Sequence, residues 1–224
     1  KPLKLKEIMK ATSGKLISGN LNKVIDKVST DTRTMNEGDM FIALIGENFD
    51  GHNFVSKAVE KNTSAIVVEK KIDISQNIPQ IIVDDTTEAL QDLASYYRNL
   101  FKDLKVIGIT GSAGKTTTKD FIGGILKKKY NVLKTEGNLN NYIGVPLTLL
   151  SLEGSEDFAV LEIGMNKEGE IGLLSKLISP QIGVITNVGP AHLENLGTIE
   201  NVAREKRKLI SELPDDGIAL LNYD

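Results

Sequence analysis

The chain has 224 residues, 40% hydrophobic and 25% charged, which is typical of a globular protein with one large or two modest domains. Its formal net charge of -3 argues against a protein that binds nucleic acid, because such a protein normally presents a basic face. The absence of cysteine excludes a disulfide framework and thiolate chemistry, and it predicts a reducing, cytoplasmic setting.

Helical and strand-like segments alternate over the first hundred or so residues. Residues 3–11 predict a short helix, and a second helix is expected near His52–Lys61. Strand-like runs lie at Met40–Leu44, Ala65–Val68 and Ile81–Val83. The clearest helical pattern is Thr86–Phe101, where apolar residues recur at helical spacing. Together these elements predict a small α/β domain over residues 1–103.

After residue 103 the pattern changes to apolar strands separated by helices. The apolar runs lie at Val106–Thr110, Phe158–Ile163, Ile182–Thr186 and Ile218–Leu221. Strands that are apolar throughout are buried on both faces, so we expect a doubly wound, mostly parallel sheet covered by helices over residues 104–224. No apolar run is long enough to span a membrane, and the first ten residues do not form a signal peptide.

A glycine-rich turn follows the first of these strands. Residues 106–118 read VIGITGSAGKTTT, in which Gly111, Ser112, Ala113 and Gly114 are small enough for backbone N–H groups to converge on a phosphate. Lys115 would reach the β- and γ-phosphates, and the Thr116 hydroxyl would ligate Mg²⁺. The strict P-loop pattern has glycine where Ile109 stands, but the strand before and the helix after predict a triphosphate site over Gly111–Thr117.

Two further strands end in polar residues. Glu162 follows the apolar run Phe158–Leu161, and a P-loop needs an acid at the end of a neighbouring strand to hold Mg²⁺. His192, one of two histidines, lies beyond Ile182–Thr186; alone, such a histidine is more often a surface or packing residue than a ligand. The charge run at Val202–Lys208 predicts a solvated helix face and singles out none of its lysines.

Together these segments resemble the Mur ligase family, the ATP-dependent ligases of peptidoglycan precursor synthesis. The resemblance is carried by TGSAGKTTTK at 110–119, TEGNLNNYIGVPLTLL at 135–150, LEIGMNKEGEI at 161–171, TNVGPAHLENLG at 186–197 and STDTRTMNEGDMFIALIGENFDGHNF at 29–54. The last of these looks like the family's UDP-sugar-binding domain. Residues 135–150 are most similar to family members that join D-alanyl-D-alanine to UDP-N-acetylmuramoyl-tripeptide.

The resemblance implies a ligase of this specificity. A substrate carboxylate would attack the γ-phosphate of ATP to form an acyl phosphate, and the incoming amine would then displace phosphate. The alternatives are a sister ligase that adds a single amino acid, or a folylpolyglutamate or cyanophycin synthetase. A GTPase-type switch is disfavoured, because the Asn-Lys pairs at 22–23 and 166–167 lack the aspartate of an NKxD guanine-specificity element.

The resemblance also assigns roles that the pattern alone leaves open. It implies catalytic functions for Lys115, Glu162, His192 and Lys206. Thr116 and Glu162 would hold the first of two Mg²⁺ ions, and His192 would help to bind the second. Lys206 matches a family lysine that reacts with CO₂ to form a carbamate, which is an anionic oxygen ligand. A register shifted by two residues would place Arg204 or Lys208 there instead.

Substrate-binding residues are expected in both domains. Thr32 and Arg33 are the candidates for the uridine diphosphate end of the substrate, with Asn48 nearby. Asn138, Asn140 and Asn141 would lie in the cleft between the domains, where neutral amides contact substrate oxygens without adding charge.

The two ends of the sequence suggest a truncated chain. It starts at Lys1 rather than at methionine, and it stops just after an apolar run. We therefore expect an incomplete central domain and no carboxy-terminal Rossmann-like domain, which in the family presents the amine. Such a chain is expected to be a monomer that binds substrate without completing ligation.

Overall fold

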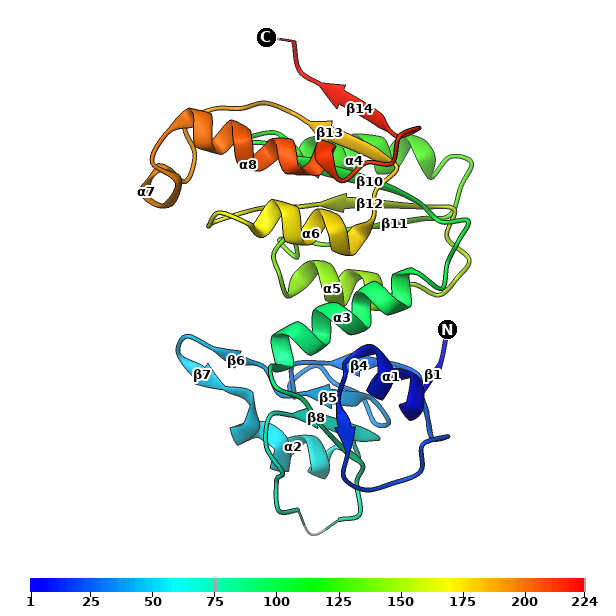
Figure 1. The fold of residues 1–224 in the computed structure, drawn as a ribbon. Helices are drawn as coiled ribbons and strands as arrows, with labels where there is room; N and C mark the ends of the chain where they lie inside the picture. Colours follow the sequence, from blue (N-terminus) through cyan, green and yellow to red (C-terminus); the bar gives the residue numbers. More distant parts are fainter. Residues whose placement is uncertain (75, 224) are drawn as a thin grey trace. The chain divides into compact units, whose positions relative to one another are not determined.

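The computed structural model describes residues 1–74 and 76–223, and its contacts divide the chain into two compact units, Lys1–Tyr96 and Tyr97–Asp224 (Figure 1). Each unit has a five-stranded sheet of its own. Among the described residues, no helix has the length and apolar character needed to cross a bilayer.

The first unit is built on a sheet with the strand order β2-β9-β8-β5-β4. Four strands are parallel, and the short β2 joins the edge antiparallel to β9. Their bounds are β2 (Lys15–Leu16), β4 (Val28–Ser29), β5 (Met40–Ile42), β8 (Ala65–Val68) and β9 (Gln80–Ile82). The central strands β5 and β8 are apolar at every position and buried along their whole length. One hydrophobic core cluster joins Phe41 and Ile66 of these strands to Val55, Ala58 and Val59 of α2 (Val55–Glu60).

Smaller elements complete the first unit. They are β1 (Leu3–Lys4) paired with β3 (Val24–Ile25), β6 (Ile45–Gly46) paired with β7 (Phe49–Asp50), α1 (Leu5–Ala11) and the 3₁₀ helix η1 (Gly51–Phe54). The sequence predicted one helix over His52–Lys61, whereas the structure has η1 followed by α2. The reason is local, because the Asp50 carboxylate accepts a hydrogen bond from His52 N at 2.9 Å and caps the tight turn. The helix α3 (Thr86–Arg98) contains the boundary at which the chain passes into the second unit.

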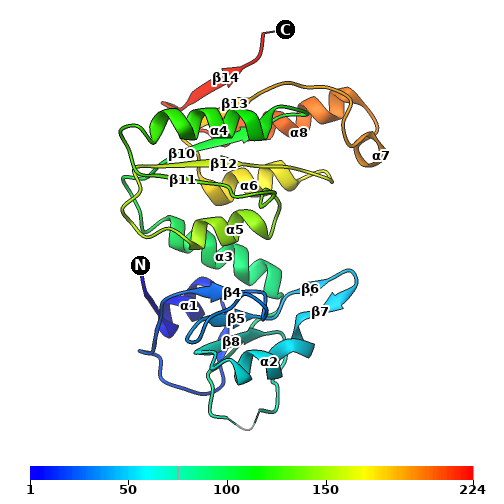
Figure 2. The same cartoon turned by 180° about the vertical axis from the view of Figure 1, so that it is seen from behind.

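The second unit confirms the predicted parallel α/β fold. Its strands follow the order β11-β12-β10-β13-β14, and every neighbouring pair is parallel. Their bounds are β10 (Lys105–Thr110), β11 (Val132–Lys134), β12 (Phe158–Glu162), β13 (Ile182–Ile185) and β14 (Ile218–Leu221). Figures 1 and 2 show α4 (Lys115–Leu126) on one face of this sheet and α6 (Glu170–Ile178) and α8 (Ile199–Ser211) on the other. Two short helices, α5 (Gly144–Leu150) and α7 (Leu193–Leu196), precede β12 and α8.

Strand register brings the polar strand ends to one edge of this sheet. Ile109 of β10 lies beside Glu162 of β12, and Thr110 lies beside Ile185 of β13. The residues after these strands therefore meet at the carboxyl edge, where ligands bind in open α/β sheets.

Candidate active site

The turn from β10 into α4 requires glycine at its first position. A Cβ built on Gly111 would lie 1.9 Å from Thr186 Oγ1, so a side chain there would collide with the loop that follows β13. Gly114 has φ +78° and is the N-cap of α4, a conformation that favours glycine. The turn is tied to the same neighbouring loop through Asn187, whose Oδ1 accepts from Ala113 N at 2.9 Å. These contacts fix the shape of the P-loop.

The start of α4 presents backbone N–H groups to this turn. The first hydrogen bond within the helix runs from Thr118 N to Gly114 O. Within the described part of the chain, the helix has no side-chain N-cap. The preceding amides of the first turn therefore point out of the helix end, where they and the helix dipole attract an anion. The Lys115 ammonium donates to Gly111 O at 2.8 Å, which adds a positive charge to the same turn.

Glu162 supplies a buried carboxylate next to this helix end. Glu162 is only 2% exposed. Its Oε2 accepts from Thr116 Oγ1 at 2.8 Å, and its Oε1 accepts from the Asn140 amide at 2.8 Å. Thr116 and Glu162, which the resemblance assigned to one Mg²⁺ ion, are therefore in direct contact.

A cavity of about 210 Å³ lies at the same edge. Six of the predicted site residues line it: Gly111, Lys115, Asn140, Asn141, His192 and Lys206. The sequence did not single out the other lining residues, which are Thr110, Gly164, Met165, Asn166 and Glu170. Four of these, Gly164, Met165, Asn166 and Glu170, fall within the quoted segment 161–171, so the motif contained a signal although no role was assigned to them. Asn138 is exposed and is not among the lining residues.

The charge run on α8 is only in part the solvated face that its composition predicted, because Arg204 and Arg207 are exposed but two charged residues between them are buried. Glu205 and Lys206 are each only 2% exposed. The helix packs against α6, and Glu205 Oε1 accepts from Gly169 N at 2.9 Å and from Ile171 N at 3.1 Å at the start of that helix. Burial, followed by the positive charge of Lys115, lowers the pKa of Lys206 to about 8, although Glu205 opposes the shift. Near physiological pH the lysine at the cavity is therefore mainly charged, with a minor neutral fraction.

The oxygen atoms of Thr116 and Glu162 at this edge are suitable ligands for the metal of a metal–nucleotide complex. Among the described residues, no group of three or more His, Cys, Asp or Glu side chains could hold a metal ion. Thr116 and Glu162 offer a hydroxyl and a carboxylate, oxygen ligands of the kind that Mg²⁺ prefers when it takes its other ligands from phosphates and water. The buried Thr110 hydroxyl, from a residue that lines the cavity, has no hydrogen-bond partner in the part of the chain that the structure describes.

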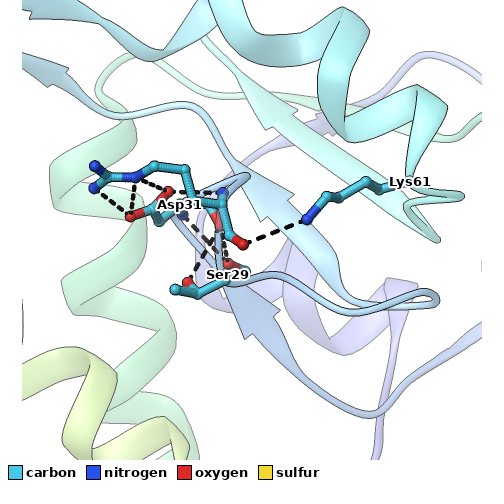
Figure 3. Close-up of polar contacts among 5 residues, drawn as sticks. Ser29, Asp31 and Lys61 are labelled. Atoms are coloured by element: carbon cyan, nitrogen blue, oxygen red, sulfur yellow. Dashed lines mark hydrogen bonds and ion pairs between the residues drawn. The ribbon is translucent and has the colours of Figure 1, made fainter.

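The predicted residues of the first unit lie at two turns. Figure 3 shows Asp31 and Ser29 in one turn, with Lys61 pointing toward it. The Asp31 carboxylate accepts from Arg33 Nη2 at 2.7 Å and from Arg33 Nε at 3.0 Å, and these hydrogen bonds hold the pKa of Asp31 below its usual value. Thr32 is buried, whereas the Arg33 side chain is 87% exposed. The second turn, between β6 and β7, contains the exposed Asn48.

Two family profiles match the chain. One, described as "Mur ligase family, catalytic domain", matches residues 24–98. The other, described as "Mur ligase middle domain", matches residues 109–224, just over half of the chain. The chain belongs to the Mur ligase family. The profile of the middle domain includes the P-loop, Glu162 and every residue that lines the cavity.

Individual Mur ligases agree with this assignment. The chain is 44% identical over 218 residues to a "UDP-N-acetylmuramoyl-tripeptide--D-alanyl-D-alanine ligase" of Bacillus subtilis (strain 168), covering 96% of this chain and 48% of that protein. It superposes on MurF from Acinetobacter baumannii with a TM-score of 0.94 at 39% identity, covering 100% of this chain and 49% of that one. MurF ligase from Thermotoga maritima in complex with ADP gives a TM-score of 0.82 at 36% identity, over 89% and 46% of the two chains. The chain spans about half the length of these relatives.

Proposed function

We propose that this Mur ligase chain takes part in the ATP-dependent joining of D-alanyl-D-alanine to UDP-N-acetylmuramoyl-tripeptide. The observation that carries the proposal is the contact between Thr116 and Glu162 beside the P-loop, at the edge where Lys115, His192 and Lys206 line one cavity. The names of the relatives support this pair of substrates. The proposed use of ATP and the cysteine-free sequence support a cytoplasmic setting for the reaction.

The reaction begins with two anions that repel each other. A carboxylate oxygen of the tripeptide attacks the γ-phosphorus of ATP, the bond to the leaving oxygen breaks, and ADP departs from an acyl phosphate. The amine of D-alanyl-D-alanine then adds to the acyl carbon and loses a proton, and the tetrahedral intermediate expels phosphate. The amides of Lys115, Thr116 and Thr117 bind phosphate oxygens at the start of α4, and the Lys115 ammonium offsets the charge on the γ-phosphate.

Two Mg²⁺ ions, when bound, would neutralise the charge that accumulates between the carboxylate and the triphosphate. Thr116 and Glu162 are proposed to hold the first ion through their oxygens. His192 lines the same cavity as Lys206, and both are proposed for the second ion. The neutral Lys206 amine can add to CO₂ and release a proton, which gives an anionic carbamate. The lowered pKa of Lys206, about 8, favours this step because only the neutral amine reacts.

Substrate contacts are proposed in both units. Asn140 and Asn141 line the cavity, where their amides can contact peptide oxygens. Asn138 precedes them on the same loop, and its carbonyl accepts from Asn140 N at 2.8 Å. In the first unit, Arg33 donates to the Asp31 carboxylate, and Thr32 and Asn48 are proposed with it for the uridine diphosphate end. The planar guanidinium can bind phosphate oxygens through paired N–H donors.

Equilibrium binding to two nucleotide-linked peptides tests the proposal. The chain is titrated with UDP-N-acetylmuramoyl-tripeptide and with the dipeptide form, in the presence of Mg²⁺ and ATP. Tighter binding of the tripeptide form supports the proposed specificity. Tighter binding of the dipeptide form would instead assign the chain to a sister ligase that adds a single amino acid. A chain that binds neither peptide nor ATP would contradict the proposal.

A further inference from the structure

A buried lysine lies on α4 one turn beyond Thr116. Lys119 is only 3% exposed, and its Nζ donates to Thr135 O at 2.9 Å. Its ion pair with the half-exposed Asp120 is longer, at 3.7 Å. Residues three apart share a helix face, so Lys119 and Thr116 point toward the same side of α4. An ammonium is costly to bury, and an apolar side chain of similar length would fill the same space without that cost.

Thr135 connects this lysine to the backbone of Glu162. It follows β11, is 1% exposed, and its Oγ1 accepts from Glu162 N at 2.9 Å. Its own N donates to Val160 O at 3.2 Å, and its carbonyl accepts from Lys119. All three polar groups of Thr135 are therefore used, and a displacement of its carbonyl would also displace the hydroxyl that holds Glu162.

The loop that begins at Thr135 returns to the same carboxylate. Asn140 Nδ2 donates to Glu162 Oε1 at 2.8 Å, and Asn140 O accepts from Gly164 N at 2.8 Å. The loop is thus held at its start by Lys119 and at its end by the strand that carries Glu162. This arrangement leaves Oε2 of Glu162 directed at the Thr116 hydroxyl.

We propose that Lys119 is a positioning residue for the Glu162 carboxylate. By holding Thr135 O, it fixes the Thr135 hydroxyl against the Glu162 backbone and the start of the loop that delivers Asn140. The identity of the ligand, a metal–nucleotide complex at Thr116 and Glu162, rests on the proposed function. The positioning itself is a property of the protein without ligand, so it can be measured separately.

Four variants of the chain separate positioning from packing and from charge. Lys119→Met keeps the aliphatic stem and removes the ammonium. Lys134→Met is the matched control. Lys134 directly precedes Thr135 and pairs with Asp120, so this substitution removes one lysine charge from the same region but leaves the side chain and carbonyl of Thr135 in place. Thr135→Val removes the hydroxyl and keeps the carbonyl, whereas Thr135→Ser keeps both.

Two measurements are made on each variant. The first is hydrogen exchange at the Glu162 amide, compared with other β12 amides, in the absence of ligand. The second is the Mg²⁺ concentration that half-maximally enhances ATP binding. We expect Lys119→Met and Thr135→Val to accelerate exchange at Glu162 and to raise the Mg²⁺ requirement by about tenfold, the effect typical of residues that orient a metal ligand. Lys134→Met and Thr135→Ser should match the wild type in both measurements.

The outcomes distinguish this inference from the proposed function. If Lys119→Met lowers the melting temperature but leaves Glu162 exchange and the Mg²⁺ requirement unchanged, the lysine only packs and the inference is wrong. An equal effect from Lys134→Met would also overturn it, because charge alone would then suffice. If the wild type shows no Mg²⁺-dependent ATP binding, the proposed function fails, and the exchange rate at Glu162 alone decides whether Lys119 positions it.

Discussion

The hydroxyl of Thr116, at the start of α4, donates to Oε2 of Glu162, at the end of β12, at 2.8 Å. The parallel register that places Ile109 beside Glu162 brings these distant residues together. A hydroxyl oxygen and a carboxylate oxygen that meet beside a helix N-terminus are suitable ligands for a cation between the protein and a triphosphate. We therefore propose that the metal lies beside this pair.

Replacing Glu162 by Gln should abolish the Mg²⁺ enhancement of ATP binding. The amide keeps the size of the side chain but removes the negative charge and one acceptor. Because loss of a group that merely orients a metal ligand costs about 10–100-fold in metal affinity, loss of the ligand itself should cost at least about 100-fold. Isothermal titration with and without Mg²⁺ measures the effect. The control is Glu136→Gln, an exposed acid near the same loop, which should behave as the wild type.

Two glycines near the same helix should respond oppositely to alanine. Gly111→Ala places a methyl group 1.9 Å from Thr186 Oγ1, so we expect it to lower the free energy of unfolding by about 1–3 kcal/mol and to prevent ATP binding. Gly124→Ala meets nothing within 4 Å and lies inside α4, so it should stabilise the protein by about 0.5–1 kcal/mol. Urea unfolding of both variants tests this pair, and destabilisation by Gly124→Ala would count against the described α4.

Lys206 should make stability depend on pH in a defined window. Burial lowers its pKa from 10.5 to about 8, so below about pH 8 it is charged in both the folded and the unfolded chain, and folding bears the full desolvation cost. Between about pH 8 and 10.5 the folded protein releases a proton that the unfolded chain retains, so this contribution to stability rises with pH.

The variant Lys206→Met removes this titration. It should raise the free energy of unfolding at pH 7 by about 1–3 kcal/mol, and the difference from the wild type should shrink toward pH 10. Urea unfolding in CO₂-free buffer at several pH values is the measurement, with the exposed Lys128→Met as control. A difference that does not change with pH would show that Lys206 is not buried as a cation.

Arg33 should contribute to binding the uridine diphosphate portion of the substrate and little to stability. Its side chain is exposed, so Arg33→Met should leave the melting temperature nearly unchanged. Loss of a charged hydrogen-bond donor should weaken UDP binding by about tenfold or more. Arg207→Met, which removes an exposed arginine on α8, should leave UDP binding unchanged. Equal affinities for UDP in all three proteins would exclude Arg33 as a contact.

Local patterns made part of the site predictable from sequence. The P-loop is one continuous segment whose small residues and flanking elements are visible in order, and Glu162 directly follows four apolar residues of a strand. The parallel sheet followed from strands that are apolar throughout, and the structure confirms it. In these cases the information needed lies within a few residues of the feature.

The remaining features depend on contacts between distant segments. β11 has only three residues, all half-buried, so its pattern gave no strand signal and the role of Thr135 could not be inferred. Lys206 lies in a charged helical run, and its burial depends on how α8 packs in the fold, where the helix contacts α6. The composition of the run gives no sign of this packing. The buried Lys119 likewise has the sequence pattern of an ordinary helix-surface lysine.

The most direct test of the central claim is a crystal structure of the chain with ATP and Mn²⁺, which replaces Mg²⁺ and can be located by anomalous scattering. The account predicts triphosphate oxygens on the first amides of α4 and a metal peak about 2.1 Å from Thr116 Oγ1 and from a Glu162 carboxylate oxygen. A nucleotide bound elsewhere, or a metal peak that contacts neither residue, would contradict it.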